Sequence, residues 1–223
     1  MKRLNTYEQA LIAVRNELVE MSGLVGKRFT LAMRSFLEQD DQIAAQVIAG
    51  DDEIDLQEEN LEMESLEIIS LQQPMDRDLR FLAAAMRISR DLERIGDYAC
   101  DIAELTLNLK DKAPYFKPLI DLPQMADLVC DMLHKSVKAY IEKDLATARK
   151  MDDLDNQVDQ LFVKLLAELT DYMKKGPEFV DQASNLLLAA RYLERTGDHV
   201  VNIAEMTIFA ETGERHPFKI KKR

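Results

Sequence analysis

The sequence predicts an all-α protein made of two tandem three-helix bundles. The composition favours long helices, because Leu, Ala, Glu, Lys and Met are abundant beside only 7 Gly, 6 Pro and no Trp. The sequence also contains an internal repeat: Arg-Asp-Leu-Glu-Arg-Ile-Gly-Asp, which begins at Arg90, returns at Arg191 as Arg-Tyr-Leu-Glu-Arg-Thr-Gly-Asp. A period of about 100 residues implies two copies of one supersecondary unit.

The first copy, residues 1–112, is expected to hold three helices. Apolar residues recur at helical spacing over 7–39, which predicts one long amphipathic helix that Gly23 and Gly26 are placed to bend. A second helix is expected over 41–73, where a proline follows it. A third is expected over 76–108, with its first aspartate as N-cap.

The second copy follows a proline-rich linker. Pro114, Pro118 and Pro123 interrupt the helical pattern, so 113–123 is predicted to connect the two repeats. The second repeat is predicted over 124–212, and residues 213–223 form a basic tail. Its three helices are expected at 124–143, 145–174 and 178–212.

The charge of the chain limits its partners. There are 41 acidic against 29 basic residues, and the net charge of −12 would repel nucleic acid and a bare anionic bilayer, whereas it favours cationic ligands. Cys100 and Cys130 form no CxxC pair, which suits a reducing compartment. No secretory signal and no apolar run of about 20 residues is recognisable, so a cytoplasmic location is expected.

The third helix of each copy carries a stripe of carboxylates. At about 100° per residue, the side chains three, four and seven residues apart share one face, opposite the apolar face that should form the core. Like charges at this spacing destabilise a helix unless cations offset them. The stripes are Glu93, Asp97, Asp101 and Glu104 in the first copy and Glu194, Asp198, Asn202 and Glu205 in the second.

The middle helix of each copy is expected to bring a second acidic stripe alongside. Asp52, Asp55 and Glu59 align with Asp152, Asp155 and Asp159 at a spacing of 100 residues. Two facing rows of oxygen ligands resemble a site for Mg²⁺, Ca²⁺ or Mn²⁺, and carboxylate clusters also hold iron or zinc. The alternative is a solvated surface whose acids pair with nearby arginines.

Two further features of the third helices are informative. Gly96 and Gly197 lie inside confident helix, where glycine is unfavourable, so a neighbouring helix is expected to approach closely there. His199 lies about 140° round from the stripe and is not expected to be a metal ligand.

The repeated phrases, together with Gln73-Pro-Met-Asp-Arg-Asp-Leu-Arg80, resemble the PhoU family over nearly the whole chain. The resemblance implies a non-enzymatic negative regulator of phosphate uptake, which links the ATPase of the phosphate ABC transporter to a phosphate-sensing histidine kinase. It also implies a homodimer with at most peripheral membrane contact, and surface clusters that bind iron, zinc, manganese or magnesium. Those clusters map onto Glu93, Asp97, Glu194 and Asp198, with Asp101, Asn202, Asp55 and Asp155 as neighbours.

The sequence departs from the PhoU pattern at two places, and two alternative interpretations of its function remain. Asn202 replaces the acid found at Asp101, and the interval from Asp144 to Asp152 is about one turn shorter than its counterpart in the first copy. One rival is a helical-bundle metalloenzyme, a carboxylate-bridged oxidase or a phosphatase; such oxidases use Glu-x-x-His pairs, which the sequence lacks. The other is a purely structural module with solvated acidic faces.

Overall fold

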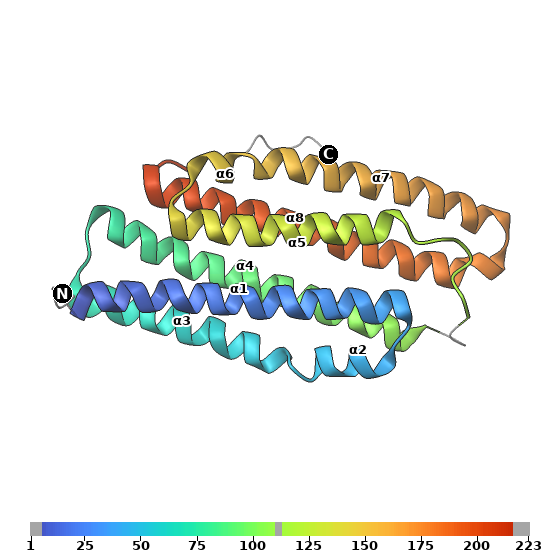
Figure 1. The fold of residues 1–223 in the computed structure, drawn as a ribbon, viewed down its shortest axis with the longest axis horizontal. Helices are drawn as coiled ribbons and strands as arrows, with labels where there is room; N and C mark the ends of the chain where they lie inside the picture. The colour runs from blue at the N-terminus through green and yellow to red at the C-terminus, as the bar shows by residue number, and fades with distance from the viewer. Residues whose placement is uncertain (1–5, 110–112, 216–223) are drawn as a thin grey trace.

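The computed structural model describes residues 6–109 and 113–215, and these residues are almost entirely helical (Figure 1). The predicted fold class, an all-α protein of two helical repeats, is confirmed. The elements are α1 Thr6–Glu38, α2 Asp41–Ile48, α3 Asp51–Gln72, α4 Asp76–Asn108, α5 Asp121–Glu142, α6 Leu145–Arg149, α7 Met151–Lys175, the 3-10 helix η1 Pro177–Phe179, and α8 Val180–Thr212.

The middle helix of each repeat is broken, contrary to the prediction. The expected helix over 41–73 is divided into α2 and α3 at Ala49 and Gly50, and the one over 145–174 is divided into α6 and α7 at Lys150. The short helices begin alike, because Asp40 and Asp144 each accept hydrogen bonds from two backbone amides of the following turn. However, α2 has 8 residues and α6 only 5, so the break comes earlier in the second repeat.

The long helices agree more closely with the prediction. Helix α1 runs through Gly23 and Gly26 without a break. Helix α4 has the predicted bounds, but its capping position is Met75, not Asp76, and no side-chain capping hydrogen bond is made there. Helix α5 begins at Asp121, earlier than predicted, with Pro123 in its first turn, where proline costs no intrahelical hydrogen bond.

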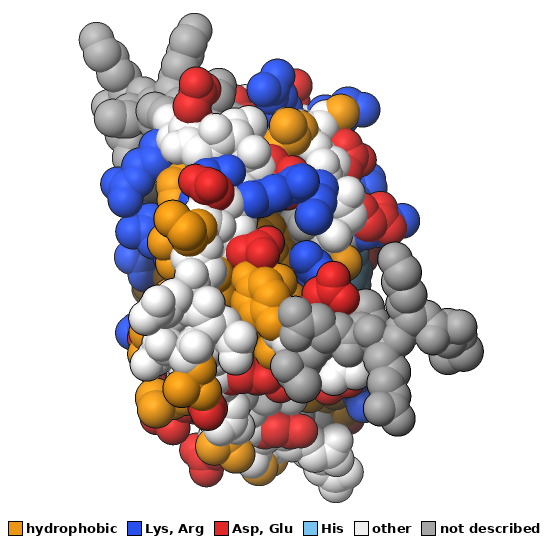
Figure 2. Space-filling view, turned by 90° about the vertical axis from the view of Figure 1, so that its left-hand side faces the viewer, with side chains coloured by type: hydrophobic (Ala, Val, Ile, Leu, Met, Phe, Trp, Pro, Cys, Tyr) orange, Lys and Arg blue, Asp and Glu red, His pale blue; other side chains and the backbone are white. Residues whose placement is uncertain are grey.

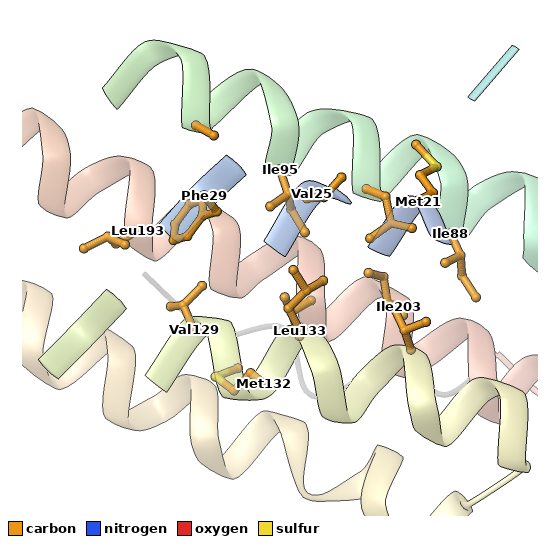
Figure 3. Close-up of a cluster of buried hydrophobic side chains, with 14 of the residues drawn as sticks. Met21, Val25, Phe29, Ile88, Ile95, Val129, Met132, Leu133, Leu193 and Ile203 are labelled. Carbon is orange, nitrogen blue, oxygen red and sulfur yellow. The ribbon is translucent and has the colours of Figure 1, made fainter. Parts of the chain in front are cut away.

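The two repeats lie side by side and share one hydrophobic core. Helix α4 packs along α8 and α1 along α5, so these four helices form the centre of the molecule, while α3 and α7 lie outside (Figure 1). In the close-up, Met21 and Phe29 of α1, Ile95 of α4, Leu133 of α5 and Ile203 of α8 lie in one cluster (Figure 3). The tandem bundles are therefore fused along their long axes.

The linker is held against both repeats. Tyr115 Oη donates a hydrogen bond of 2.6 Å to the Phe36 carbonyl oxygen in the first repeat. Phe116 packs against Tyr172 and Phe179 of the second repeat, with ring centroids 4.6 and 5.3 Å away. The predicted basic tail lies mostly outside the described residues.

The described helices are amphipathic or short of apolar residues along their length. None of these helices has an apolar stretch that is long enough to cross a bilayer.

Candidate metal-binding site

Three aspartates converge between α3 and α4 in the first repeat. Each of Asp51, Asp55 and Asp97 offers a carboxylate oxygen, and the three oxygens lie within 4.8 Å of one another. Two ligands on opposite sides of a calcium ion lie about 4.8 Å apart, so small side-chain rotations would place all three around a hard cation. This trio, which we call the Asp51 cluster, fits a divalent cation with oxygen ligands.

The break between α2 and α3 brings Asp51 into this cluster. Arg28 of α1 is 7% exposed, and its guanidinium fills the corner at Gly50. A Cβ added to Gly50 would lie 2.5 Å from Arg28 Nη2, so a larger residue here would displace the guanidinium. Arg28 also donates a 2.7 Å hydrogen bond to Glu53. The chain thus restarts as α3 with Asp51 in its first turn.

A close approach of α3 to α4 brings the other two aspartates together. An added Cβ on Gly96 would lie 2.9 Å from Ile54 Cδ1, which confirms the predicted reason for a glycine inside this helix. Ile54 is 1% exposed and anchors α3 on α4. Asp55, the next residue, therefore lies at the edge of the contact, near Asp97.

The acids of this region raise one another's pKa. Burial is the largest cause of the raised pKa of Asp55, followed by repulsion from Asp51 and Asp97. The pKa of Glu93 is raised by burial and then by Asp97, while Arg94 and Arg90 oppose that rise. Such repulsion is relieved by a bound cation.

An arginine already neutralises part of this charge. Arg94 Nη1 donates a 2.6 Å hydrogen bond to Asp97, and its Nε lies 3.4 Å from Glu93. Because its side chain is 42% exposed, Arg94 has room to swing away when a cation binds. The same residues therefore form an ion-paired surface here and also offer oxygen ligands that fit a cation.

A thiol also contacts the cluster. Cys100 Sγ donates a 3.2 Å hydrogen bond to Asp51, and burial followed by this hydrogen bond raises the pKa of Cys100. The cysteine is thus held as a thiol and not as a thiolate ligand. Beside it lies an open groove of about 530 Å³, to which Asp101 and Glu104 of α4 and Arg195 of α8 contribute.

The second repeat is built differently at the matching place. Asp155 approaches Gly197 as Ile54 approaches Gly96, with Asp155 Oδ1 2.6 Å from an added Cβ. Val158 Cγ1 also lies 3.5 Å from that added Cβ, and Val158, Leu165 and Leu169 are buried as Ile54, Leu61 and Ser65 are, at a spacing of 104 residues. The capping residues Asp40 and Asp144 have the same spacing. In this register Asp155 corresponds to Asp51 and Asp159 to Asp55, so the predicted alignment of Asp55 with Asp155 is displaced by about one turn.

Other predicted site residues of the second repeat are partly buried. Asp155 is 3% and Glu194 6% exposed, contrary to the expectation that the acidic stripe lies opposite the core. Arg191 Nη1 donates a 2.6 Å hydrogen bond to Glu194. Asp152, Asp159 and Asp198 are half-buried. Within residues 6–109 and 113–215, only the Asp51 cluster brings three acidic, histidine or cysteine ligands within 4.8 Å of one another.

A search against protein-family models matches this chain twice. The model described as the PhoU domain covers residues 18–106 and 122–207, one match in each repeat. The chain belongs to the PhoU family.

Curated relatives match the PhoU chain over nearly its full length. The "Phosphate-specific transport system accessory protein PhoU homolog 1" of Methanothermobacter thermautotrophicus is 36% identical over 94% of this chain and 95% of its own. A PhoU homolog of Zymomonas mobilis is 35% identical over 96% of this chain and 90% of its own.

Solved PhoU structures have the same fold. That of Pseudomonas aeruginosa has a TM-score of 0.89 at 31% identity, covering 93% of this chain and all of the other. That of Streptococcus pneumoniae has a TM-score of 0.88 at 27% identity, covering 94% and 99%.

Residues of the two PhoU repeats also meet each other across α4 and α8. His199 Nδ1 lies 2.7 Å from Asp91 Oδ1, and Asn202 Nδ2 donates a 3.2 Å hydrogen bond to the same oxygen. Tyr98, the counterpart of His199, stacks on Tyr192, the counterpart of Asp91, at 5.8 Å. The repeats are therefore related by a pseudo-twofold axis, and Asn202 contacts the inter-repeat interface.

The sequence reasoning missed Asp51 and included residues that do not join the cluster. Asp52 and Glu59 are exposed on α3 and point away from α4. Asp51 follows Gly50, and a glycine before three acidic residues is a signal for a new helix N-terminus. Once α2 and α3 are separated there, Asp51 and Asp55 lie one turn apart on the same face.

Proposed function

We propose that this chain is a negative regulator of inorganic phosphate uptake and of phosphate-starvation signalling. The observation that carries this proposal is its similarity, over nearly the whole chain, to proteins named phosphate-specific transport system accessory protein. The PhoU domain model matches each of its two repeats. It acts in the cytoplasm as a homodimer, without catalysing a reaction.

The mechanism we propose is that of an adaptor. When phosphate is plentiful, the helical faces bind the ATPase of the phosphate ABC transporter and the sensor histidine kinase, so that both are restrained together. The fused core supports this role, because a rigid body with long helical faces presents separate surfaces to two partners.

In this mechanism the Asp51 cluster binds a metal ion. Its oxygen ligands suit magnesium or manganese, and carboxylate clusters also hold iron or zinc. Asp51, Asp55 and Asp97 hold the ion, while Glu93 and Asp101 lie nearby and add negative charge. The ion supplies positive charge that joins α3 to α4. In the second repeat Asp155, Asp159 and Asp198 correspond to Asp51, Asp55 and Asp97, but among the described residues only the first-repeat trio brings its oxygens within 4.8 Å of one another, so the first repeat holds the better-formed site.

The metalloenzyme alternative receives no support from this geometry. Carboxylate-bridged oxidases hold their metals with side chains that point into the bundle core. Asp55 is exposed, and Asp51 and Asp97 are half-buried at the rim of the contact between α3 and α4. A cation there acts on helix packing and surface charge.

The adaptor proposal is tested with purified partners. The transporter ATPase and the cytoplasmic part of the kinase are each immobilised, and binding of the full chain is measured by biolayer interferometry. Binding to both proteins is expected, together with loss of phosphate repression of a reporter gene when the chain is deleted. An absence of binding to either partner, with normal repression in the deletion strain, would refute the adaptor.

The metal proposal is tested by elemental analysis. Protein purified without chelator is compared with a variant carrying Asp51→Asn, Asp55→Asn and Asp97→Asn. The matched control replaces the exposed Asp127 and Asp153 by Asn. Stoichiometric metal in the wild type and control, but not in the triple variant, is expected. Equal metal in all three proteins would show that the Asp51 cluster is not the site.

A further inference from the structure

Helix α3 has an unusual distribution of charge. Its 22 residues include nine acidic residues and neither lysine nor arginine. Helix α7, its counterpart, carries lysines at 164, 174 and 175. A helix without internal cations does not neutralise itself with pairs of opposite charge one turn apart. The charge of α3 is therefore available to a cation from outside the helix.

The same helix exposes large apolar side chains. Leu56 is 57% exposed, Met63 67%, Leu66 45% and Leu71 67%. Leu56 and Met63 lie two turns apart and Leu66 nearly one turn further, which is the spacing of anchors for a docked helix. Single exposed apolar residues are ordinary, but several on one face of one helix indicate an interaction site.

This face points away from the rest of the molecule. Ile54, Leu61 and Ile68, on the opposite side of α3, are 1 to 6% exposed and pack into the core against α1 and α4. We call the residues of the outward side the α3 outer face: Asp52, Leu56, Glu59, Glu62, Met63, Leu66, Glu67 and Leu71.

The carboxylates of the α3 outer face make no salt bridge within the described part of the chain. Arg28 pairs with Glu53 at 2.7 Å and Arg90 approaches Glu58 at 3.9 Å, but both of these acids lie off the outer face. Figure 2 shows the end of the molecule: Lys and Arg gather over its upper half, whereas few lie over the lower part, where the first repeat lies. On this face of the molecule the basic side chains thus lie mainly over the second repeat.

We propose that the α3 outer face binds a basic amphipathic helix of a partner protein. Apolar side chains of that helix pack on Leu56, Met63 and Leu66, and its flanking Lys or Arg residues pair with Glu59 and Glu67. An anionic lipid surface would be repelled by this face, and a second copy of this chain would bring a net charge of −12 toward it. The inference rests on the proposed adaptor function and specifies the partner segment.

The probe is a fluorescein-labelled peptide of about 18 residues, or five helical turns, made of Leu, Ala and Lys with all Leu on one face. A scrambled peptide of identical composition controls for bulk charge. Fluorescence anisotropy measures binding to the full-length wild type and to two variants. One variant, Leu56→Ser with Met63→Ser, removes apolar contacts without changing charge. The other reverses charge through Glu59→Lys and Glu67→Lys.

The matched control reverses the same number of charges on the exposed side of α7, through Asp153→Lys and Asp171→Lys. Each α3 variant is expected to weaken binding of the amphipathic peptide at least tenfold, equivalent to about 1.4 kcal/mol, with much less change in the α7 control. The scrambled peptide is expected to bind at least tenfold more weakly than the amphipathic one. Equal losses in the α3 and α7 variants, or equal binding of both peptides, would overturn the inference.

Two further measurements exclude other occupants. If light scattering shows that the wild type is a dimer and that the α3 variants are monomers, the occupant is a second copy and the inference fails. If the α3 variants lose the peptide but still bind the transporter ATPase and the kinase with unchanged affinity, the inference fails while the adaptor stands. If the wild type binds neither protein, the adaptor fails, whatever the peptide shows.

Discussion

Arg94 competes with a bound cation for the carboxylate of Asp97, so its removal should tighten metal binding. Its guanidinium lies 2.6 Å from Asp97 and 3.4 Å from Glu93, on the order of 5 Å from an ion held by Asp97. Because Arg94 is 42% exposed, solvent screens this repulsion. The Coulomb energy is therefore closer to its value at the dielectric constant of water than to its value in a protein interior. For a divalent ion the repulsion is about 1–2 kcal/mol, which corresponds to roughly 5- to 30-fold in affinity.

The test compares Arg94→Gln with Arg87→Gln. Arg87 is exposed on the same helix two turns earlier, so its substitution changes the net charge equally without touching the Asp51 cluster. Isothermal titration calorimetry with Mn²⁺ on chelator-treated protein measures the dissociation constants. Tighter binding by Arg94→Gln than by Arg87→Gln is expected. Weaker binding by Arg94→Gln would mean that Arg94 orients Asp97 for the metal, and the competition argument would be refuted.

Three further predictions concern stability. Burial, and then a hydrogen bond to a neighbouring glutamate, raises the pKa of Glu17 to about 7. The folded state therefore binds this proton more tightly than the unfolded state does. The free energy of unfolding should fall as the pH rises from about 4.5 to 7. Glu17→Gln should flatten this slope in urea titrations, by less than about 1 kcal/mol because the half-buried group is still screened by solvent; an unchanged slope would contradict this prediction. Gly96→Ala should lower the free energy of unfolding by about 1–3 kcal/mol, because the added methyl group contacts Ile54. In the double variant, Ile54→Val should recover part of this loss. Additive losses in the double variant would argue against that contact. Asp91→Ala and His199→Ala should show a coupling of about 1 kcal/mol in a double-mutant cycle of unfolding free energies, and zero coupling would show that their 2.7 Å contact is not stabilising.

The helices that periodicity predicted are largely those of the structure. Apolar spacing is a local property of the chain, so α1, α4 and α8 were predicted nearly to their ends. The predicted core face of α4 also agrees with the structure, because Leu92, Ile95 and Ile102 are fully buried. The short α2 and α6 were missed, because helical periodicity continues across a break of one or two residues and hides it.

The candidate site was predicted less completely. Asp55 and Asp97 do converge, but their third partner is Asp51, which the break at Gly50 brings into place. Asp155 was expected on an exposed stripe and is buried against Gly197. Whether any of these residues binds metal remains a prediction.

The sequence by itself determined the all-α class, the duplication, the core faces of the long helices and the PhoU membership. Each follows from local periodicity or from motifs that repeat along the chain. Only the tertiary structure decided which carboxylates meet, because periodicity gives the face of a helix but not its register against a neighbour. A shift of one residue turns a side chain by about 100°, so it is the register of each helix against its neighbour that buries Asp155 and leaves Asp55 exposed.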